Sequence, residues 1–243
     1  MHTISITELL ILLLLLITMM VVCIKTGKLS FPAALAAGLT GVLVFAGAGY
    51  TGIALLGAFF VMGVVATAHK KALKAKITSD GRHPEKRKAS QVFANGGVAA
   101  ITALLAIADP GHKAVYTVML AASLAAAAAD TLSSELGMVY GSNCFNILTF
   151  KKEPKGLDGV ISIEGTLMGA AGALVIAIIY AFANGFNRNG VFILLAGIIG
   201  NFVDSILGAS LERKHYIGND VVNFLNTLFA ALVAWVFYIS YFR

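Results

Sequence analysis

Eight apolar stretches, each long enough to cross a bilayer as a helix, dominate this chain of 243 residues. A helix needs about 20 mostly apolar residues to span the hydrocarbon core. Hydrophobic residues make up 58% of the chain and charged residues only 12%, more apolar surface than a soluble fold can bury. We therefore predict an all-α, multi-pass integral membrane protein that forms a single membrane domain over residues 1–243. The predicted spans are 6–24, 30–48, 51–68, 91–108, 114–136, 162–184, 189–209 and 220–241.

Lysine and arginine residues predict how these spans are oriented, because cytoplasmic loops carry an excess of basic residues. If the loop 69–90 lies in the cytoplasm, only Lys113, Arg188 and Arg243 of the 18 lysines and arginines fall outside. This bias predicts eight spans in the cell membrane with both termini outside. It also explains the formal charge of +6, so we expect no nucleic-acid partner. The larger cytoplasmic loops are then 69–90, 137–161 and 210–219.

Five carboxylates lie in or at the ends of the apolar stretches, where an ionised side chain is costly. The cost begins at about 2.5 to 3.5 kcal/mol at the centre of a spanning helix, and such side chains usually face a protein-lined cavity and carry function. The predicted topology puts all five toward the cytoplasmic ends of their helices. They are Asp130, Glu135, Glu164, Asp204 and Asp220.

Other polar residues fall at the same ends of these four helices and of the span 91–108. Asp130, Ser133 and Ser134 share one helical face by their spacing. We therefore expect polar side chains from five helices to converge at the inner leaflet. The further members of this group are Asn95, Asp158, Ser162, Asn201, Asn219 and Asn223.

This set of side chains suits a divalent metal ion and phosphate groups. Carboxylate, amide and hydroxyl oxygens are hard ligands, and Mg²⁺ typically binds one or two carboxylates together with substrate phosphates. Basic residues near the same face, such as Lys88 and Lys155, could neutralise phosphate oxygens. The sequence contains neither a GxxxxGK[ST] loop nor GxGxxG, and its five histidines are scattered, so the helix ends themselves would have to hold the phosphates.

Structural roles compete with these functional ones. A carboxylate near a helix end can cap the helix or bond to a neighbouring Ser or Asn, which applies to Glu135, Glu164 and Asp220. Asp158 lies between Gly156 and Gly159, where a turn residue is common. For any single lysine of the basic loop, determining topology is a sufficient explanation.

Five ordered segments of the chain resemble one family of integral membrane proteins. This family includes the plant phytyl-phosphate kinase of tocopherol synthesis and many bacterial and archaeal relatives. This chain departs from the family pattern at Leu157, where a threonine is expected, and at Glu164, where a small or apolar residue is expected. The matching segments are SQVFANGG (90–97), AADTLSSELG (128–137), KGLDGVISIEGTLMG (155–169), NFVDSILGASLE (201–212) and NDVVNFLNT (219–227).

The resemblance implies a kinase that transfers a phosphoryl group from CTP, or another nucleoside triphosphate, to a prenyl monophosphate such as phytyl phosphate. The product would be the diphosphate, formed at the cytoplasmic interface with Mg²⁺ as cofactor. Asp130, Asp204 and Asp220 would act in catalysis as metal ligands, with Glu135 in support. Substrate and nucleotide would contact Asn95, Ser134, Asp158, Ser162, Asn201, Asn219, Asn223, Lys88 and Lys155.

Other functions stay open at this point. A prenol kinase or a cytidylyltransferase could use the same metal and nucleotide. A membrane transporter or lipid flippase would need charges near the midplane in corresponding halves of the chain, whereas here the charges lie toward one face. The sequence does not indicate an oligomeric state.

Overall fold

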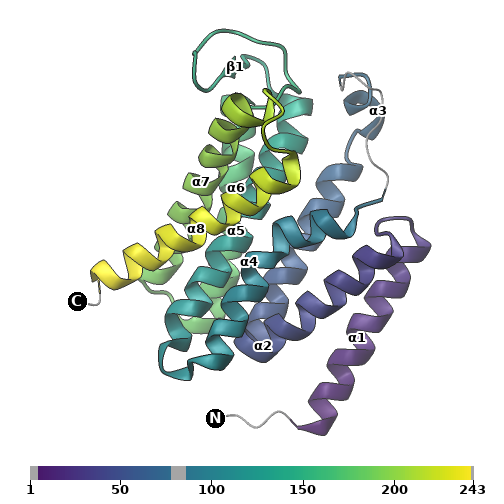
Figure 1. Ribbon diagram of the computed structural model, residues 1–243, viewed down its shortest axis with the longest axis vertical. Helices are drawn as coiled ribbons and strands as arrows, with labels where there is room; N and C mark the ends of the chain where they lie inside the picture. The colour runs from purple at the N-terminus through teal and green to yellow at the C-terminus, as the bar shows by residue number, and fades with distance from the viewer. Residues whose placement is uncertain (1–4, 78–85, 242–243) are drawn as a thin grey trace.

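The computed structural model describes residues 5–77 and 86–241, so part of the predicted loop 69–90 lies outside the described residues. The described chain is almost entirely helical and forms one bundle (Figure 1). The helices are α1 (Ile6–Lys25), α2 (Phe31–Ala68), α3 (Lys71–Lys74), α4 (Ala89–Ala108), η1 (Pro110–His112), α5 (Lys113–Tyr140), α6 (Ile163–Asn184), α7 (Arg188–Leu207), η2 (Gly208–Glu212) and α8 (Asn219–Tyr241), and the two short strands are β1 (Phe145–Asn146) and β2 (Val160–Ile161).

Six helical segments are long and apolar enough to cross a membrane: α2, α4, α5 with η1, α6, α7 with η2, and α8. This confirms the prediction of an all-α, multi-pass membrane protein. By the same measure α1 is a shorter apolar helix, Leu10–Lys25. The number of crossings and the side on which each terminus lies stay predictions.

The predicted spans 30–48 and 51–68 are joined in α2, which is 38 residues long and broken only at Gly49. Gly49 has φ 63° and ψ −150°, a conformation that glycine adopts readily and residues with a Cβ do not. An apolar pattern alone suggests two helices with a loop, whereas here a single glycine makes the turn.

The two halves of α2 run antiparallel, because both ends of the helix contact the same residue. The Ser30 N–H, just before α2, donates to the Arg87 carbonyl at 3.1 Å. Near the other end, a Cβ added to Gly63 would lie 2.9 Å from the Arg87 guanidinium. A straight helix of this length would extend about 57 Å, far beyond the reach of one side chain. The chain therefore folds back at Gly49 (Figure 1).

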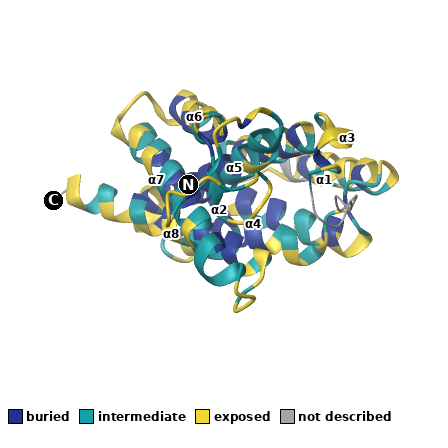
Figure 2. Cartoon of the chain, turned by 90° about the horizontal axis from the view of Figure 1, so that it is seen from above, coloured by how far each residue is buried: buried dark blue, intermediate teal, exposed yellow. Residues whose placement is uncertain are grey.

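Helix α5 is the centre of the bundle and packs against α2, α4, α6, α7 and α8. Figure 2 shows buried residues gathered where α5 meets its neighbours. From Leu120 to Ala129 each residue is at most 1% exposed. The alanines there allow close approach of glycines on other helices: a Cβ on Gly169 would lie 2.8 Å from the Ala129 carbonyl oxygen. Small residues at helix contacts are typical of membrane bundles.

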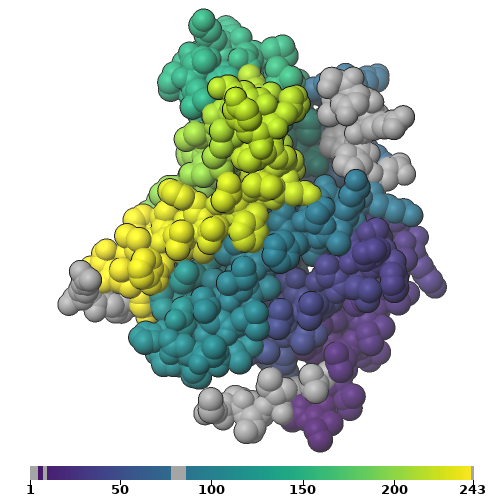
Figure 3. All heavy atoms as spheres, viewed as in Figure 1, coloured from purple at the N-terminus to yellow at the C-terminus, as the bar shows by residue number. Residues whose placement is uncertain are grey.

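The predicted loops 137–161 and 210–219 are partly helical. α5 continues to Tyr140 and ends before Gly141, since no glycine other than Gly137 and no proline interrupts its last turns. α7 continues directly into the π-helix η2. Between α5 and α6 the chain forms an antiparallel pair of short strands, β1 and β2. Figure 3 shows this connection at the top of the molecule, beside the residues that precede α8.

Candidate functional site

A cavity of about 410 Å³ lies at one end of the bundle, where α2, α5 and α7 end and α4, α6 and α8 begin. The connection between α5 and α6 lines the cavity from Lys155 to Ser162. Most of the predicted site residues line this one space. They are Asn95, Asp130, Ser134, Glu135, Lys155, Asp158, Ser162, Asn201, Asp204, Asn219 and Asn223.

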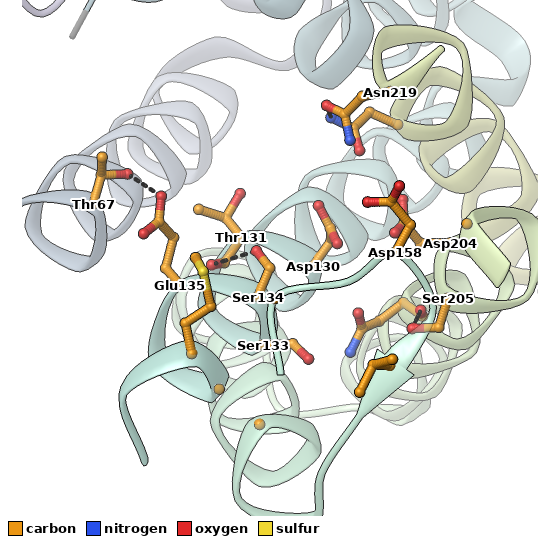
Figure 4. Close-up of a pocket in the computed structure, with 18 of the residues that line it drawn as sticks. Thr67, Asp130, Thr131, Ser133, Ser134, Glu135, Asp158, Asp204, Ser205 and Asn219 are labelled. Atoms are coloured by element: carbon orange, nitrogen blue, oxygen red, sulfur yellow. Dashed lines mark hydrogen bonds between the residues drawn. The ribbon is translucent and has the colours of Figure 1, made fainter. Parts of the chain in front are cut away.

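Asp130 of α5 and Asp204 of α7 form the centre of an acidic wall. Their carboxyl groups are close enough to interact, and Figure 4 shows both beside Asp158. Asn226 of α8 donates its side-chain N–H to Asp204 Oδ1 at 3.3 Å. Two carboxylates this close repel each other unless a cation or a proton lies between them. The pair therefore suits a bound cation.

Two buried asparagines of α8 lie at this end of the bundle, and Asn223 lines the cavity. Asn223 is 8% exposed, and among the described residues its Oδ1 has no hydrogen-bond partner. The Oδ1 of Asn226, 1% exposed, is also unpartnered within the described chain. A buried carbonyl left without a partner is costly, so a ligand that accepts its lone pair would stabilise the site.

This donor set fits Mg²⁺, which uses hard oxygen ligands and keeps positions for water and phosphate. Within residues 5–77 and 86–241, no group of three His, Cys, Asp or Glu side chains could hold a metal ion. Two carboxylates and an amide oxygen would therefore have to share the ion with substrate oxygens. That is the usual arrangement where Mg²⁺ bridges protein and phosphate.

Glu135 lies at the rim of the cavity with protein partners of its own. Lys74 of α3 is fully buried, forms an ion pair with Glu135, and donates to the carbonyls of Ala66 and Thr67 at 2.8 Å each. The Thr67 hydroxyl donates to Glu135 Oε1 at 2.9 Å (Figure 4). Because Lys74 binds the last carbonyls of α2, which carry the negative end of the helix dipole, α3 is fixed against α2 and α5.

Asp158 is held at the cavity by its backbone. Arg213 donates its Nε–H to the Asp158 carbonyl at 2.5 Å, and its Nη2 pairs with Glu153 at 2.7 Å. Burial raises the pKa of Asp158, while Arg213 and His215 act in the opposite direction. The hydrogen bond from Arg213 lowers the pKa of Glu153. The connection between α5 and α6 is thus tied to η2.

Ser162, a predicted binding residue, has a structural role as well as its place on the cavity wall. Its hydroxyl accepts the Gly165 N–H at 3.0 Å and caps the start of α6. Glu164, in the first turn of α6, accepts a hydrogen bond from the Ser142 hydroxyl and is not among the described residues that line the cavity. Of the five carboxylates singled out in the sequence, Glu164 is therefore a structural residue here.

Lys88, which the sequence suggested as a phosphate contact, does not line the cavity in the described structure. Its side chain is exposed, and its N–H donates to Gln91 Oε1 at 2.9 Å to cap α4. The preceding residue, Arg87, lines the cavity instead. The start of α4 turns neighbouring side chains in different directions, and the sequence does not specify which one points inward.

Asp220 also lies away from the described cavity wall, although Asn219 and Asn223 of the same helix line it. Residues four apart share a helix face, whereas a neighbouring residue is rotated by about 100°. The face that presents Asn219 and Asn223 therefore turns Asp220 aside. The acidic wall has Asp130 and Asp204 without this third carboxylate.

Sequence reasoning missed several cavity residues. Arg87 and Thr67 lie at helix ends whose orientation depends on distant contacts. Glu212 had a signal, because it follows Asp204 by eight residues and Gly208 by four, close to one helical face. The polar cavity residues that the site prediction did not name include Lys28, Thr67, Arg87 and Glu212.

The fold and the cavity define a multi-pass helical membrane protein with a polar pocket at one end of its bundle. The family described as Integral membrane protein DUF92 matches residues 14–231, and the chain belongs to this family. The resemblance read from the sequence segments is confirmed at this level.

The chain is 31% identical to Protein VTE6, chloroplastic, of Arabidopsis thaliana over 206 residues, which cover 82% of this chain and 62% of that protein. It therefore spans less than two thirds of that relative. It is 34% identical to an uncharacterized membrane protein of Methanocaldococcus jannaschii, covering 78% of this chain and 77% of the relative. An uncharacterized membrane protein of Synechocystis sp. is 30% identical, with 80% and 76% covered. No solved structure matches the chain.

Proposed function

We propose that this protein is a kinase that transfers a phosphoryl group from a nucleoside triphosphate, CTP in the first instance, to a prenyl monophosphate such as phytyl phosphate. One observation carries the proposal: a single cavity at one end of a membrane bundle combines the facing carboxylates Asp130 and Asp204 with the cations Arg87 and Lys155. The family resemblance to a phytyl-phosphate kinase supports the same reaction.

The acidic wall suits the nucleotide. Mg²⁺, when bound, would neutralise negative charge on the nucleotide phosphates. Asp130 and Asp204 are the residues that would hold it, with the free Oδ1 of Asn223 as a neutral ligand. Asn226 keeps Asp204 in place through its hydrogen bond.

The rest of the lining has to position phosphates and exclude water. Phosphoryl transfer depends mainly on alignment and charge neutralisation, with little covalent chemistry from the protein. A phosphate acceptor is already anionic, so the reaction does not require a dedicated base. Lysine and arginine on the wall offset the charge that two substrates bring together.

The location at a helix end supports an interfacial reaction. A prenyl phosphate has its head at the membrane surface and its tail in the bilayer, while nucleotide and Mg²⁺ come from water. The basic-residue bias favours a cytoplasmic cavity, where nucleoside triphosphates are available. We therefore propose that the site faces the cytoplasm.

The packing of α5 favours an enzyme over a transporter or flippase. Beyond the cavity, Leu120 to Ala129 are buried against neighbouring helices, whereas alternating access requires a site near the midplane between mobile halves. A prenol kinase or a cytidylyltransferase would use the same cavity and differs in its product.

The deciding experiment incubates the purified protein in detergent with Mg²⁺, labelled CTP or ATP, and either phytyl phosphate or phytol. The proposal expects a prenyl diphosphate from phytyl phosphate, lost in Asp204→Asn. Monophosphate formed from phytol would identify a prenol kinase, and a cytidylyl lipid would identify a cytidylyltransferase. Substrate uptake by proteoliposomes without nucleotide would contradict an enzyme.

A further inference from the structure

Arg87 is a rigidly placed cation on the cavity wall. Its N–H donates to the Lys28 carbonyl at 3.0 Å, and its own carbonyl accepts the Ser30 N–H at 3.1 Å. These two bonds fix the backbone of Arg87 to the turn between α1 and α2. The side chain therefore starts from a defined point before it reaches the cavity.

The guanidinium of Arg87 has no hydrogen-bond acceptor within residues 5–77 and 86–241. The nearest carboxylate, Glu135, acts on it only through its charge, because Lys74 and Thr67 already bind that carboxylate. Burial lowers the pKa of Arg87 and Glu135 opposes this, but an arginine stays charged. A half-buried guanidinium with free donors on a cavity wall calls for an anionic ligand.

The absence of a side chain at Gly63 leaves room for this guanidinium to lie against α2. A Cβ added at Gly63 would lie 2.9 Å from Arg87 Nη2 and 3.6 Å from Cζ. The arginine head thus lies directly on the helix backbone at a position where only hydrogen is present. Its orientation depends on a residue that does not itself line the cavity.

The surroundings of Arg87 are partly apolar. Phe60, Val64 and Thr67 of α2 line the cavity and share one helical face, because they are spaced by three or four residues. Gly63 borders this face, three residues after Phe60 and four before Thr67. Figure 4 shows Thr67 on one side of the cavity and Asp158 and Asp204 on the other. The wall that carries Arg87 therefore joins a cation to apolar side chains, while the far wall is acidic.

We propose that Arg87 binds the phosphate of the prenyl acceptor, with the first carbons of the tail against Phe60 and Val64. The inference rests on the proposed function and assigns one wall of the cavity to each substrate. A guanidinium matches two phosphate oxygens at once, and the phosphate monoester arrives without a metal ion. The nucleotide phosphates, with their Mg²⁺, suit the acidic wall.

The test measures binding of labelled phytyl phosphate to the detergent-purified protein without nucleotide, with unlabelled phytol as the competitor that lacks a phosphate. Arg87→Gln should weaken phytyl phosphate at least about 10-fold, a loss of about 1.4 kcal/mol, and leave phytol unchanged. Arg87→Lys should fall between them, since lysine keeps the charge but loses the two-point contact. Lys86→Gln, an exposed neighbour, is the matched control and should bind like the parent.

Steady-state kinetics separate the two substrates. Arg87→Gln should raise KM for phytyl phosphate and leave KM for the nucleotide unchanged, and Gly63→Ala should do the same with the charge retained. A raised nucleotide KM with unchanged phytyl phosphate affinity would overturn the assignment. If Arg87→Gln does not fold, the same comparison is made with Arg87→Lys and Gly63→Ala.

The phytyl phosphate binding measurement also distinguishes this inference from the proposed function. Phosphate-dependent binding that is lost in Arg87→Gln, without diphosphate formation from any nucleotide, would support the Arg87 site and contradict the kinase. Diphosphate formation with equal binding in Arg87→Gln and the parent would support the kinase and contradict the Arg87 site.

Discussion

The two ends of α5 differ in how closely neighbouring helices pack against them. From Leu120 to Ala129 the side chains are mostly alanine and at most 1% exposed. Glycines of α6 and α7 approach them so closely that a Cβ on Gly200 would lie 2.7 Å from Ala126 Cβ. From Asp130 onward the same helix lines a cavity of about 410 Å³.

This contrast separates stability from function along one helix. The alanine half brings neighbouring helices into close contact, which stabilises membrane bundles through packing. The polar half contains groups whose burial is unfavourable without partners. We infer that the tight half keeps the helices in place while the other half stays open for ligands.

The largest effect is expected at the acidic wall of the open half. Asp130→Asn or Asp204→Asn should lower phosphoryl transfer by at least about 100-fold, as loss of a key electrostatic group does in other enzymes. The thermal midpoint in detergent should stay level or rise, because one of two facing like charges is removed. Product formation and a melting curve on the same sample measure both quantities.

Asp220→Asn is the matched control, since Asp220 lies at the same end of the bundle but away from the described cavity wall. It should keep most of the activity. An equal loss in Asp220→Asn would show that the α8 carboxylate does belong to the site.

The next effect is expected in the closed half. In Gly197→Val the added Cβ would lie 2.8 Å from Ala125 Cβ and 3.0 Å from Ala173 Cβ, and overpacking of this kind costs about 1 to 3 kcal/mol. The thermal midpoint should fall, while KM values of the folded fraction stay unchanged. Gly57→Ala is the control, because a Cβ there meets nothing within 4 Å. Equal loss in both variants would contradict the role of close packing.

A smaller effect is expected at Asn226, where the two halves meet. Asn226→Ala removes the hydrogen bond to Asp204. A hydrogen bond to a charged group contributes about 1.5 to 3 kcal/mol, so its loss should lower activity about 10-fold or more. More Mg²⁺ should be needed for half-maximal rate, which a purely structural residue would not change. Asn184→Ala, which loses a bond to the Tyr180 carbonyl, should leave the Mg²⁺ requirement alone.

The smallest effect is expected in the connection between α5 and α6, which lines the cavity from Lys155 to Ser162. The folded pKa of Glu153 lies below its ordinary value of 4.5, so its bond to Arg213 contributes stability above about pH 4.5 and loses it as the pH falls through the lower folded value. Hydrogen exchange in residues 144–160 should be slower in the parent than in Glu153→Gln at pH 6. The two proteins should converge near pH 3, and a constant difference would exclude this ion pair as the cause.

The sequence was sufficient to predict how far along its helix, between the two ends of the bundle, each polar group lies. Runs of apolar residues predict where each helix begins and ends, and the alternating direction of successive spans predicts which helix ends lie at the same face. Asp130, Asn201, Asp204 and Asn223 therefore come together as predicted, although they are far apart in the chain. Depth follows from counting residues along a helix, which a sequence provides directly.

The direction in which each side chain points around its helix was not predictable in the same way. Asp220 and Lys88 lie at the right depth but face elsewhere, and that depends on how α8 and α4 are rotated against their neighbours. The Lys74–Glu135 ion pair joins residues 61 positions apart and requires the fold of α3. Rotation and distant pairing arise from packing, on which apolar periodicity gives only partial information.

The turn at Gly49 has a consequence for membrane sidedness. It lies at the end of the bundle opposite to Arg87, and Tyr50 beside it is 60% exposed. Of the two natural cysteines, Cys23 is buried and Cys144 borders the cavity. In sealed vesicles, an impermeant thiol reagent should therefore reach Cys144 from one compartment and the thiol of Tyr50→Cys from the other, so one natural and one introduced cysteine would mark the two faces of the membrane.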